Sequence, residues 1–245
     1  MIVRQAAHVL ELLEYFARRG RPATLSEVAQ DLGWPRSSTH NLLGTLAARG
    51  YLYEPRARDG YYPSPRLLVL AQAIAQAEPL PEALTRLLRA LVDETGETAA
   101  IAAAAGTSAV FIEVCESPRP IRYFAQVGLR MPIHITSCGR AILSQLNPAE
   151  RASILRKVSF ERFGPATPMS AAAVEAEIGR SVERGWFQNL SEYSQDLCGV
   201  SLPLPWAGRQ LALVVAGPIN RMQDRIPALA ARMRHALAQA MAGAA

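Results

Sequence analysis

The chain has little cysteine, no long apolar run and no phosphate-binding loop, and each shortage excludes a class of protein. Its three cysteines, Cys115, Cys138 and Cys198, lack a C-x-x-C or Cys/His spacing, which argues against a disulfide framework and against structural zinc. The most apolar stretch, Ala99 to Ala105, is too short to cross a bilayer. No G-x-G-x-x-G or P-loop pattern is present, so nucleotide chemistry is unsupported. We expect a cytoplasmic protein with no cofactor, metal or membrane partner.

The composition is that of a folded protein with two domains. Half of the 245 residues are hydrophobic and 19% are charged, and this length is enough for one small core and one of ordinary size. The net charge is +5, a mild basic excess that supports a phosphate-bearing partner only weakly.

Residues 24–50 predict two helices joined by a tight turn. Thr24 is an N-cap with Glu27 three residues later, as in a capping box, and this first helix stops at the turn Gly33-Trp34-Pro35. One side of the second helix is apolar and carries Leu42, Leu43 and Leu46. Such a pair is the DNA-reading motif in outline, in which the second helix enters the major groove by its N-terminal end.

The other side of the second helix carries the candidate DNA-contacting residues. Hydroxyl side chains in the first turn let backbone amides approach phosphate oxygens, and Asn pairs with adenine where Arg prefers guanine. We expect base edges to be contacted by Ser37, Ser38 and Asn41, and phosphates by Arg36, His40 and Arg58. Arg58 lies in a predicted hairpin wing between two tyrosine-rich runs.

The alternative for this segment is a helix pair that touches no nucleic acid, which occurs in many helical domains. A preceding amphipathic helix, the helix pair and the hairpin, in that order, favour DNA binding. We therefore assign residues 1–63 to a winged helix-turn-helix domain.

The rest of the chain predicts a linker and an α+β domain. Residues 64–79 form a linker helix with a broad apolar face, which packs either on its own winged domain or, as we favour, on another subunit. Residues 80–245 form the second domain, in which runs of strands rather than regular βαβ units alternate with helices. Predicted strands lie at 99–106, 108–117, 121–128, 186–192, 199–204 and 210–217.

Three blocks carry a resemblance to a known family. They are TLSEVAQDLGWPRSSTHNLLGTLAARGYLY, VGLRMPIHITSCGRAILSQL, and the stretch from ERGWFQNLSE to GVSLPL. With these blocks the chain resembles the IclR family of bacterial transcriptional regulators over nearly its full length. The resemblance implies a GAF-like effector-binding domain after the winged helix-turn-helix, a homodimer or homotetramer on a double-stranded operator, and control of genes for degrading an aromatic or other organic acid.

The resemblance also implies an effector pocket. Its expected residues are Tyr123, Met131, Thr136, Ser137, Cys138, Asn189, Leu197 and Gly199. Independently, a strand-to-helix turn near Ser137 exposes backbone N–H groups that suit a carboxylate. Asn189 and Gly199 stand where a familiar member has an acid and a thiol, so polar recognition of the ligand differs here. The longer loop from Ser191 to Cys198 leaves the register of Glu192 and Asp196 open.

Two rival functions remain. Cys138 at a helix start, with His134 four residues earlier, would make a nucleophile and base for a cysteine-dependent hydrolase of small molecules, although no third orienting group is evident. A sensor domain whose helix-turn-helix has become a dimerisation module is the other. Loss of DNA affinity on changing Arg36, Ser37 and Asn41 separates this last case from the DNA-binding interpretation.

Overall fold

The computed structural model describes residues 3–77 and 80–242, and the chain divides into two units, Met1–Pro79 and Leu80–Ala245. The last two residues of the expected linker, 78–79, lie outside the described residues. Within the described ranges, no helix has both the length and the apolar character needed to cross a membrane.

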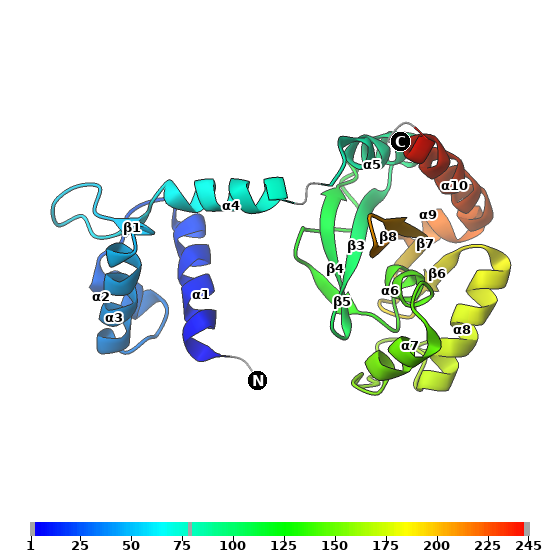
Figure 1. The fold of residues 1–245 in the computed structure, drawn as a ribbon, viewed down its shortest axis with the longest axis horizontal. Coiled ribbons are helices and arrows are strands. Elements are labelled where there is room, and N and C mark those ends of the chain that lie inside the picture. Colours follow the sequence, from blue (N-terminus) through cyan, green and yellow to red (C-terminus); the bar gives the residue numbers. More distant parts are fainter. Residues whose placement is uncertain (1–2, 78–79, 243–245) are drawn as a thin grey trace. The chain divides into compact units, whose positions relative to one another are not determined.

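The first unit consists of helices and one small hairpin (Figure 1). Its elements are α1 (Arg4–Arg19), α2 (Leu25–Asp31), α3 (Arg36–Ala48), β1 (Leu52–Tyr53), β2 (Tyr62–Pro63) and α4 (Arg66–Ala77). The two strands pair antiparallel, so the predicted helix-turn-helix and wing are confirmed. The core between the helices is built from Leu12, Phe16, Val28, Leu43 and Leu52.

Local signals in the sequence set the boundaries of α2 and α3. The Thr24 hydroxyl accepts a hydrogen bond from the Glu27 amide at 3.3 Å, and the Glu27 carboxylate accepts from the Thr24 amide at 2.8 Å, which confirms the capping box. Pro35, the last residue of the predicted turn, is the N-cap of α3. A Cβ at Gly60 would lie 2.2 Å from the Ala23 carbonyl oxygen, so this glycine lets the wing close against the start of the motif.

The second unit is an antiparallel sheet covered by helices. Its elements are α5 (Glu82–Thr95), β3 (Thr98–Ala105), β4 (Ser108–Cys115), β5 (Arg130–Pro132), α6 (Ser137–Leu143), α7 (Pro148–Leu155), α8 (Ala171–Arg184), β6 (Phe187–Leu190), β7 (Leu197–Trp206), β8 (Arg209–Pro218), α9 (Ile219–Met222), a 3-10 turn (Gln223–Arg225) and α10 (Ile226–Ala242). The strand order is β5-β4-β3-β8-β7-β6. The predicted α+β, GAF-like fold is confirmed.

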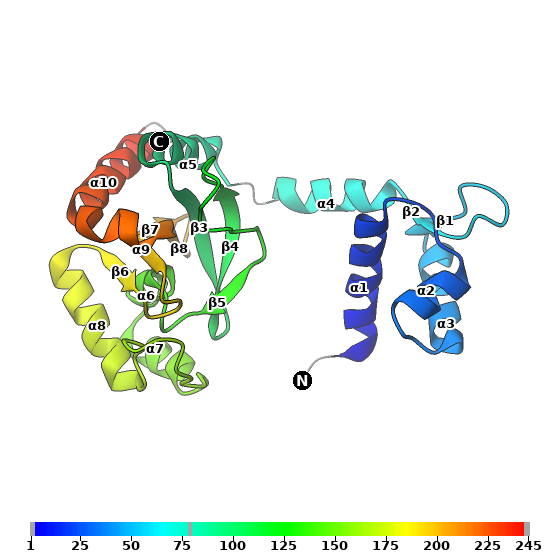
Figure 2. The same cartoon turned by 180° about the vertical axis from the view of Figure 1, so that it is seen from behind.

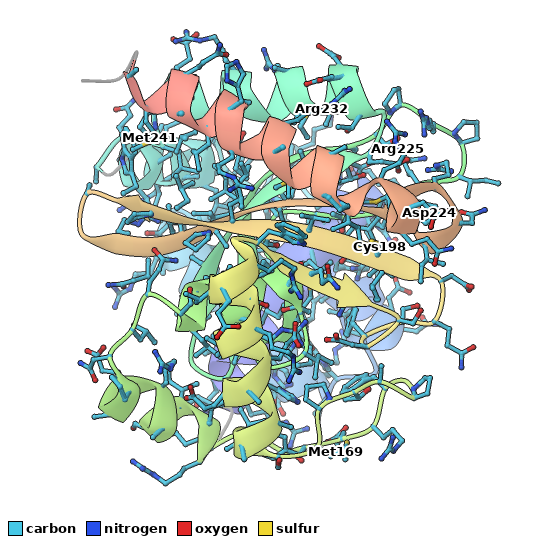
Figure 3. All side chains as sticks on the ribbon, turned by 90° about the vertical axis from the view of Figure 1, so that its right-hand side faces the viewer. Met169, Cys198, Asp224, Arg225, Arg232 and Met241 are labelled. Atoms are coloured by element: carbon cyan, nitrogen blue, oxygen red, sulfur yellow. The ribbon has the colours of Figure 1, made fainter. Side chains whose placement is uncertain are left out.

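The two faces of the sheet bury separate cores. Because side chains alternate along a strand, Ile101 and Leu213 face α5 and α10, whereas Ala102 and Val214 face α6 and α8. Figure 2 shows the helices on both sides of the sheet. Figure 3 shows α10, which begins just after Arg225 and passes Met241, on one side of the sheet. The residues expected to form the effector pocket lie on the α6 face.

One predicted strand is wrong. Residues 121–128 form an irregular segment and not a strand, and the edge strand next to β4 is β5. Ile121 and Phe124 are 73% and 57% exposed, so their apolar character does not reflect burial in a sheet. The segment is held by the Thr98 hydroxyl, which donates to the Tyr123 carbonyl at 2.7 Å.

The close packing of α6 gives a stability test. A Cβ at Gly139 would lie 2.1 Å from the Ile133 carbonyl oxygen, whereas a Cβ at Gly179 in α8 would touch nothing within 4 Å. We expect Gly139→Ala to lower the free energy of unfolding by about 3 kcal/mol, and Gly179→Ala to raise it by about 1 kcal/mol through helix propensity. Urea denaturation followed by circular dichroism measures both. A Gly139→Ala protein as stable as the wild type would contradict the packing.

Candidate functional site

The candidate DNA-contacting residues lie on the surface of the first unit. The exposed residues at the start of α3 are Arg36, Ser37, Ser38, His40 and Asn41, and Arg58 is exposed in the wing. Thr39 is buried on the opposite side of α3, where its hydroxyl donates to the Pro35 carbonyl at 3.0 Å. The hydroxyl- and amide-bearing edge is therefore open to a partner.

Two of these residues share a surface with α1. Ser38 and Asn41 border a broad groove whose other side includes Arg4 and His8. The His8 ring stacks on Trp34 with ring centroids 4.4 Å apart, which fixes that side of the groove. A duplex that reaches Asn41 would therefore also meet the start of α1.

The wing presents one arginine outward. Arg56 lies 3.8 Å from Asp59, so its charge is partly compensated. Within the described part of the chain, no carboxylate lies within 4.0 Å of Arg58, whose backbone is left-handed with φ of 72°. Arg58 is thus an exposed wing arginine whose charge is not compensated by a described carboxylate.

The second unit brings all the expected pocket residues around one cavity. They are Tyr123, Met131, Thr136, Ser137, Cys138, Asn189, Leu197 and Gly199. Four further lining residues were not anticipated, namely Phe111, Tyr193, Val214 and Ala216. The cavity volume is about 30 Å³, and none of the described side chains that line it carries a formal charge at neutral pH. It is an apolar chamber with few polar groups.

Three hydrogen bonds fix the start of α6 beside this cavity. The Thr136 hydroxyl accepts from the Gly139 amide at 3.2 Å, as an N-cap does. The Ser137 hydroxyl accepts from Ser201 at 2.8 Å, and the Asn189 amide nitrogen donates to the Ile135 carbonyl at 2.6 Å. The turn expected near Ser137 is therefore tied to β6 and β7.

An ion pair ties the loop after β6 to α6. Arg140 has no exposed surface, pairs with Glu192 and donates to the Gln188 carbonyl at 2.5 Å. The carboxyl of Glu192 is largely buried, which raises its pKa. The sequence left the register of Glu192 open, and the structure places it at this pair, next to the cavity-lining Tyr193.

A surface groove adjoins the cavity. It has a volume of about 700 Å³ and shares Tyr123, Tyr193 and Leu197 with the cavity. These three side chains therefore stand between the chamber and the groove. Asp196 lines the groove and not the cavity, and its carbonyl accepts from the Ile219 amide at 2.8 Å.

The geometry does not support the cysteine-hydrolase alternative. Cys138 is 2% exposed, its thiol donates to the Thr136 hydroxyl at 3.6 Å, and burial raises the pKa of the thiol. The His134 ring packs edge-on against Phe160, and burial, with a smaller effect from Arg140, lowers its pKa. Desolvation outweighs the hydrogen bonds at the start of α6 that lower this pKa, so no activated thiol results.

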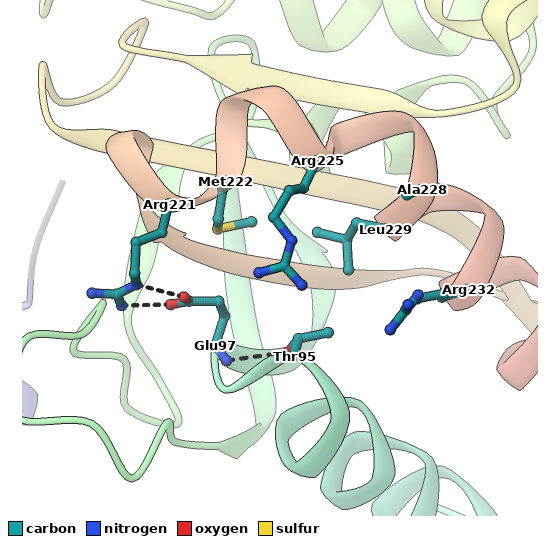
Figure 4. Close-up of a pocket in the computed structure, with 8 residues that line it drawn as sticks. All are labelled: Thr95, Glu97, Arg221, Met222, Arg225, Ala228, Leu229 and Arg232. Carbon is teal, nitrogen blue, oxygen red and sulfur yellow. Dashed lines mark hydrogen bonds and ion pairs between the residues drawn. The ribbon is translucent and has the colours of Figure 1, made fainter.

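A second hollow of about 60 Å³ lies under α10 and is rich in arginine (Figure 4). Its carboxylate, Glu97, is buried and accepts from Arg221 at 2.7 and 2.8 Å and from Arg119 at 2.8 Å. Arg225 and Arg232 point toward the same hollow (Figure 4). The paired Glu97 clamps α9 and the segment after β4 to the start of β3.

Comparison with known proteins identifies the chain. The family model for the C-terminal part of the bacterial transcriptional regulator IclR matches residues 72–242, and the model for the IclR helix-turn-helix domain matches residues 5–56. The chain belongs to the IclR family. The resemblance on which the sequence prediction depended is therefore confirmed.

IclR relatives match over most of their length. The chain is 30% identical over 224 residues to the HTH-type transcriptional regulator BhcR of Paracoccus denitrificans, with 91% of this chain and 80% of the relative covered. It is 25% identical over 226 residues to the transcriptional repressor IclR of Escherichia coli, with 91% and 82% covered. These relatives are transcriptional regulators and not enzymes.

Solved IclR structures share the fold. The Thermotoga maritima IclR structure has a TM-score of 0.76 at 17% identity, with 96% of each chain covered. An IclR homologue from Microbacterium hydrocarbonoxydans, complexed with 4-hydroxybenzoate, has a TM-score of 0.74 at 20% identity, with 98% of this chain and 99% of that chain covered.

The Arg140–Glu192 pair gives a pH-dependent test. In Arg140→Met the Glu192 carboxylate stays buried without its partner, so we expect the free energy of unfolding to fall by about 3 kcal/mol at pH 7. The pKa of Glu192 is already raised by burial, and loss of Arg140 raises it further. Protonation as the pH falls from 7 to 5 removes the uncompensated charge, so the deficit shrinks at low pH.

Urea denaturation at the two pH values measures this deficit. The double variant Arg140→Met/Glu192→Gln is the control, because it has no carboxylate left to titrate at that position. The free energies of unfolding of the single variant and the double variant should differ at pH 7 and become similar at pH 5. Equal differences at both pH values would show that the pair contributes no charge compensation.

Proposed function

We infer that this IclR-type regulator is a homo-oligomer that places two α3 helices in successive major grooves of an operator and is controlled by a small organic acid. In this proposal Ser37, Ser38 and Asn41 contact base edges, while Arg36, His40 and Arg58 contact phosphates. The exposure of this polar edge, on a helix whose other side is buried, is the observation that carries the proposal. A protein that acts on DNA in this way works in the bacterial cytoplasm.

The linker helix supports oligomer formation. Four large apolar residues of α4 are 43% to 67% exposed, and they are Leu68, Val69, Leu70 and Ile74. Contiguous exposed apolar surface marks a contact with another protein more often than a solvated face. A second copy of α4 would cover it, and the spacing of two recognition helices would then follow from the symmetry of the pair.

The cavity beside α6 is the proposed effector site. Its aromatic and aliphatic walls suit a small apolar or aromatic body, and the 4-hydroxybenzoate complex of the homologue with the same fold is consistent with such a ligand. Because the cavity is small, a ligand enters only when the side chains of Tyr123, Tyr193 and Leu197 move apart. Ligand binding alters the affinity for DNA only to the extent that the ligand binds one arrangement of the subunits more tightly than another. A coupling free energy of about 1–3 kcal/mol between the two sites is sufficient for ordinary induction.

The DNA proposal predicts two distinct mutational effects. Arg58→Ala should weaken binding to all sequences and reduce the slope of log affinity against log salt by about 1. Asn41→Ala should cost about 1–3 kcal/mol on the operator, relax the preference at one base pair and leave the salt slope unchanged. Fluorescence anisotropy with an operator selected from random DNA, at several salt concentrations, measures both.

A matched control for this experiment is Arg180→Ala on α8, which removes an exposed arginine from the second unit and should change neither affinity nor slope. If Arg58→Ala and Asn41→Ala bind the operator as tightly as the wild type, α3 and the wing do not form the DNA interface. The alternative of a sensor domain whose helix-turn-helix serves as a dimerisation module would then be favoured.

The effector proposal predicts that filling the cavity abolishes ligand stabilisation. An acid present at a hundred times its Kd should stabilise the wild type by about 2.7 kcal/mol. In Ser137→Trp this effect should disappear, and in Gly199→Ala it should weaken, since a Cβ there lies 3.0 Å from the Ser137 hydroxyl. A thermal-shift panel of organic acids measures the change. An acid that stabilises all three proteins equally binds elsewhere.

A further inference from the structure

The orientation of the Asn189 amide is fixed by its neighbours. One end of the amide lies 2.6 Å from the Ile135 carbonyl oxygen. A carbonyl oxygen accepts only from a donor, so this end is the nitrogen, and the flipped amide would bring two oxygens together. The other end of the amide is therefore a carbonyl-type acceptor.

That acceptor is buried and without a partner. Asn189 is 3% exposed, it lines the cavity beside α6, and its Oδ1 atom has no hydrogen-bond donor among the described residues. Asn189 pairs with Gly199 across β6 and β7, and the missing Cβ of Gly199 would approach both Ser137 Oγ and Asn189 Cβ, at 3.0 and 3.9 Å. The lack of a Cβ at Gly199 thus lets β7 lie close to Ser137 and Asn189 at the wall of the cavity.

A buried acceptor restricts what is bound beside it. A carboxylate or ketone oxygen placed there would face another oxygen, and the side chains described around the cavity include no cation to offset the repulsion. A ligand that displaces a water hydrogen-bonded to the acceptor keeps its affinity only if it supplies a donor that replaces this hydrogen bond. The site therefore discriminates by the presence of a donor.

We propose that the effector carries an O–H or N–H group that donates to Asn189 Oδ1, so that the effectors are hydroxylated or amide-bearing small organic compounds and not simple oxoacids. This inference rests on the proposed function, in which the cavity binds the effector. A site built around a buried polar group rejects analogues that lack its partner far more strongly than an apolar wall rejects a missing methylene.

The test compares ligands that differ only in the donor. The probes are 4-hydroxybenzoate against 4-fluorobenzoate, 4-hydroxyphenylacetate against 4-fluorophenylacetate, and lactate against propionate. Isothermal calorimetry on the full chain measures each Kd. For pairs that fit the cavity, the hydroxyl compound should bind about tenfold or more tightly than its partner.

Protein variants assign the preference to one atom. Asn189→Leu removes the acceptor and should bring the Kd values of the two members of a pair to within about twofold of each other. Arg180→Ala, an exposed change on α8 away from the cavity, should keep the preference for the hydroxyl compound. The comparison of ligands on the wild type stands without Asn189→Leu if that variant does not fold. Operator affinity of each protein, measured alongside, shows whether the first unit is intact.

Three results would overturn the proposal. If the fluoro or unsubstituted acids bind the wild type as tightly as the hydroxyl acids and Ser137→Trp abolishes both, the cavity is the effector site but needs no donor. If the preference for the hydroxyl compound persists in Asn189→Leu, another group recognises it. If the protein binds neither the hydroxyl compounds nor their partners but still binds operator DNA, the effector site and its donor requirement both fail. The DNA-binding function then stands.

Discussion

The close contact of Gly139 with the backbone of Ile133 is the constraint on which the second unit depends. It lets a short helix, α6, lie wholly buried against the sheet. A helix start in that position must have its polar groups satisfied from inside the protein. Thr136, Ser201 and Asn189 provide this through side-chain hydrogen bonds, and the same residues form or adjoin the polar part of the cavity. The packing of α6 and the proposed recognition of a ligand therefore depend on the same arrangement of residues.

The first unit uses its surface in the opposite way. Its core is formed by one side of each helix, so the hydroxyl and amide side chains of α3 remain in solvent together with Arg58 of the wing. These groups contribute little to folding, since surface substitutions seldom change stability by much. Their value is in contacts with a partner, which is consistent with membership of a family of DNA-binding regulators.

Much of this was predictable from the sequence because local signals act locally. Thr24 and Glu27 form the capping box that their spacing predicts. Phe111 was not predicted as a cavity residue. The alternation of side chains along a strand predicts which face of the sheet Phe111 lies on, but it does not predict which core residues border a cavity. The segment from Ile121 was misassigned because apolar residues in an exposed crossing have the same composition as an edge strand. The burial of Arg140 depends on Glu192, 52 residues away, which no local pattern encodes.

Hydrogen exchange of the full chain with its selected operator, with and without a bound small acid, tests the central claim most directly. The account predicts that DNA slows exchange in α3 and in the wing around Arg58, and that the acid slows exchange in α6 and in the strands beside Asn189 and Gly199. Operator DNA that protects only the second unit, or an acid that leaves α6 unchanged, would contradict it.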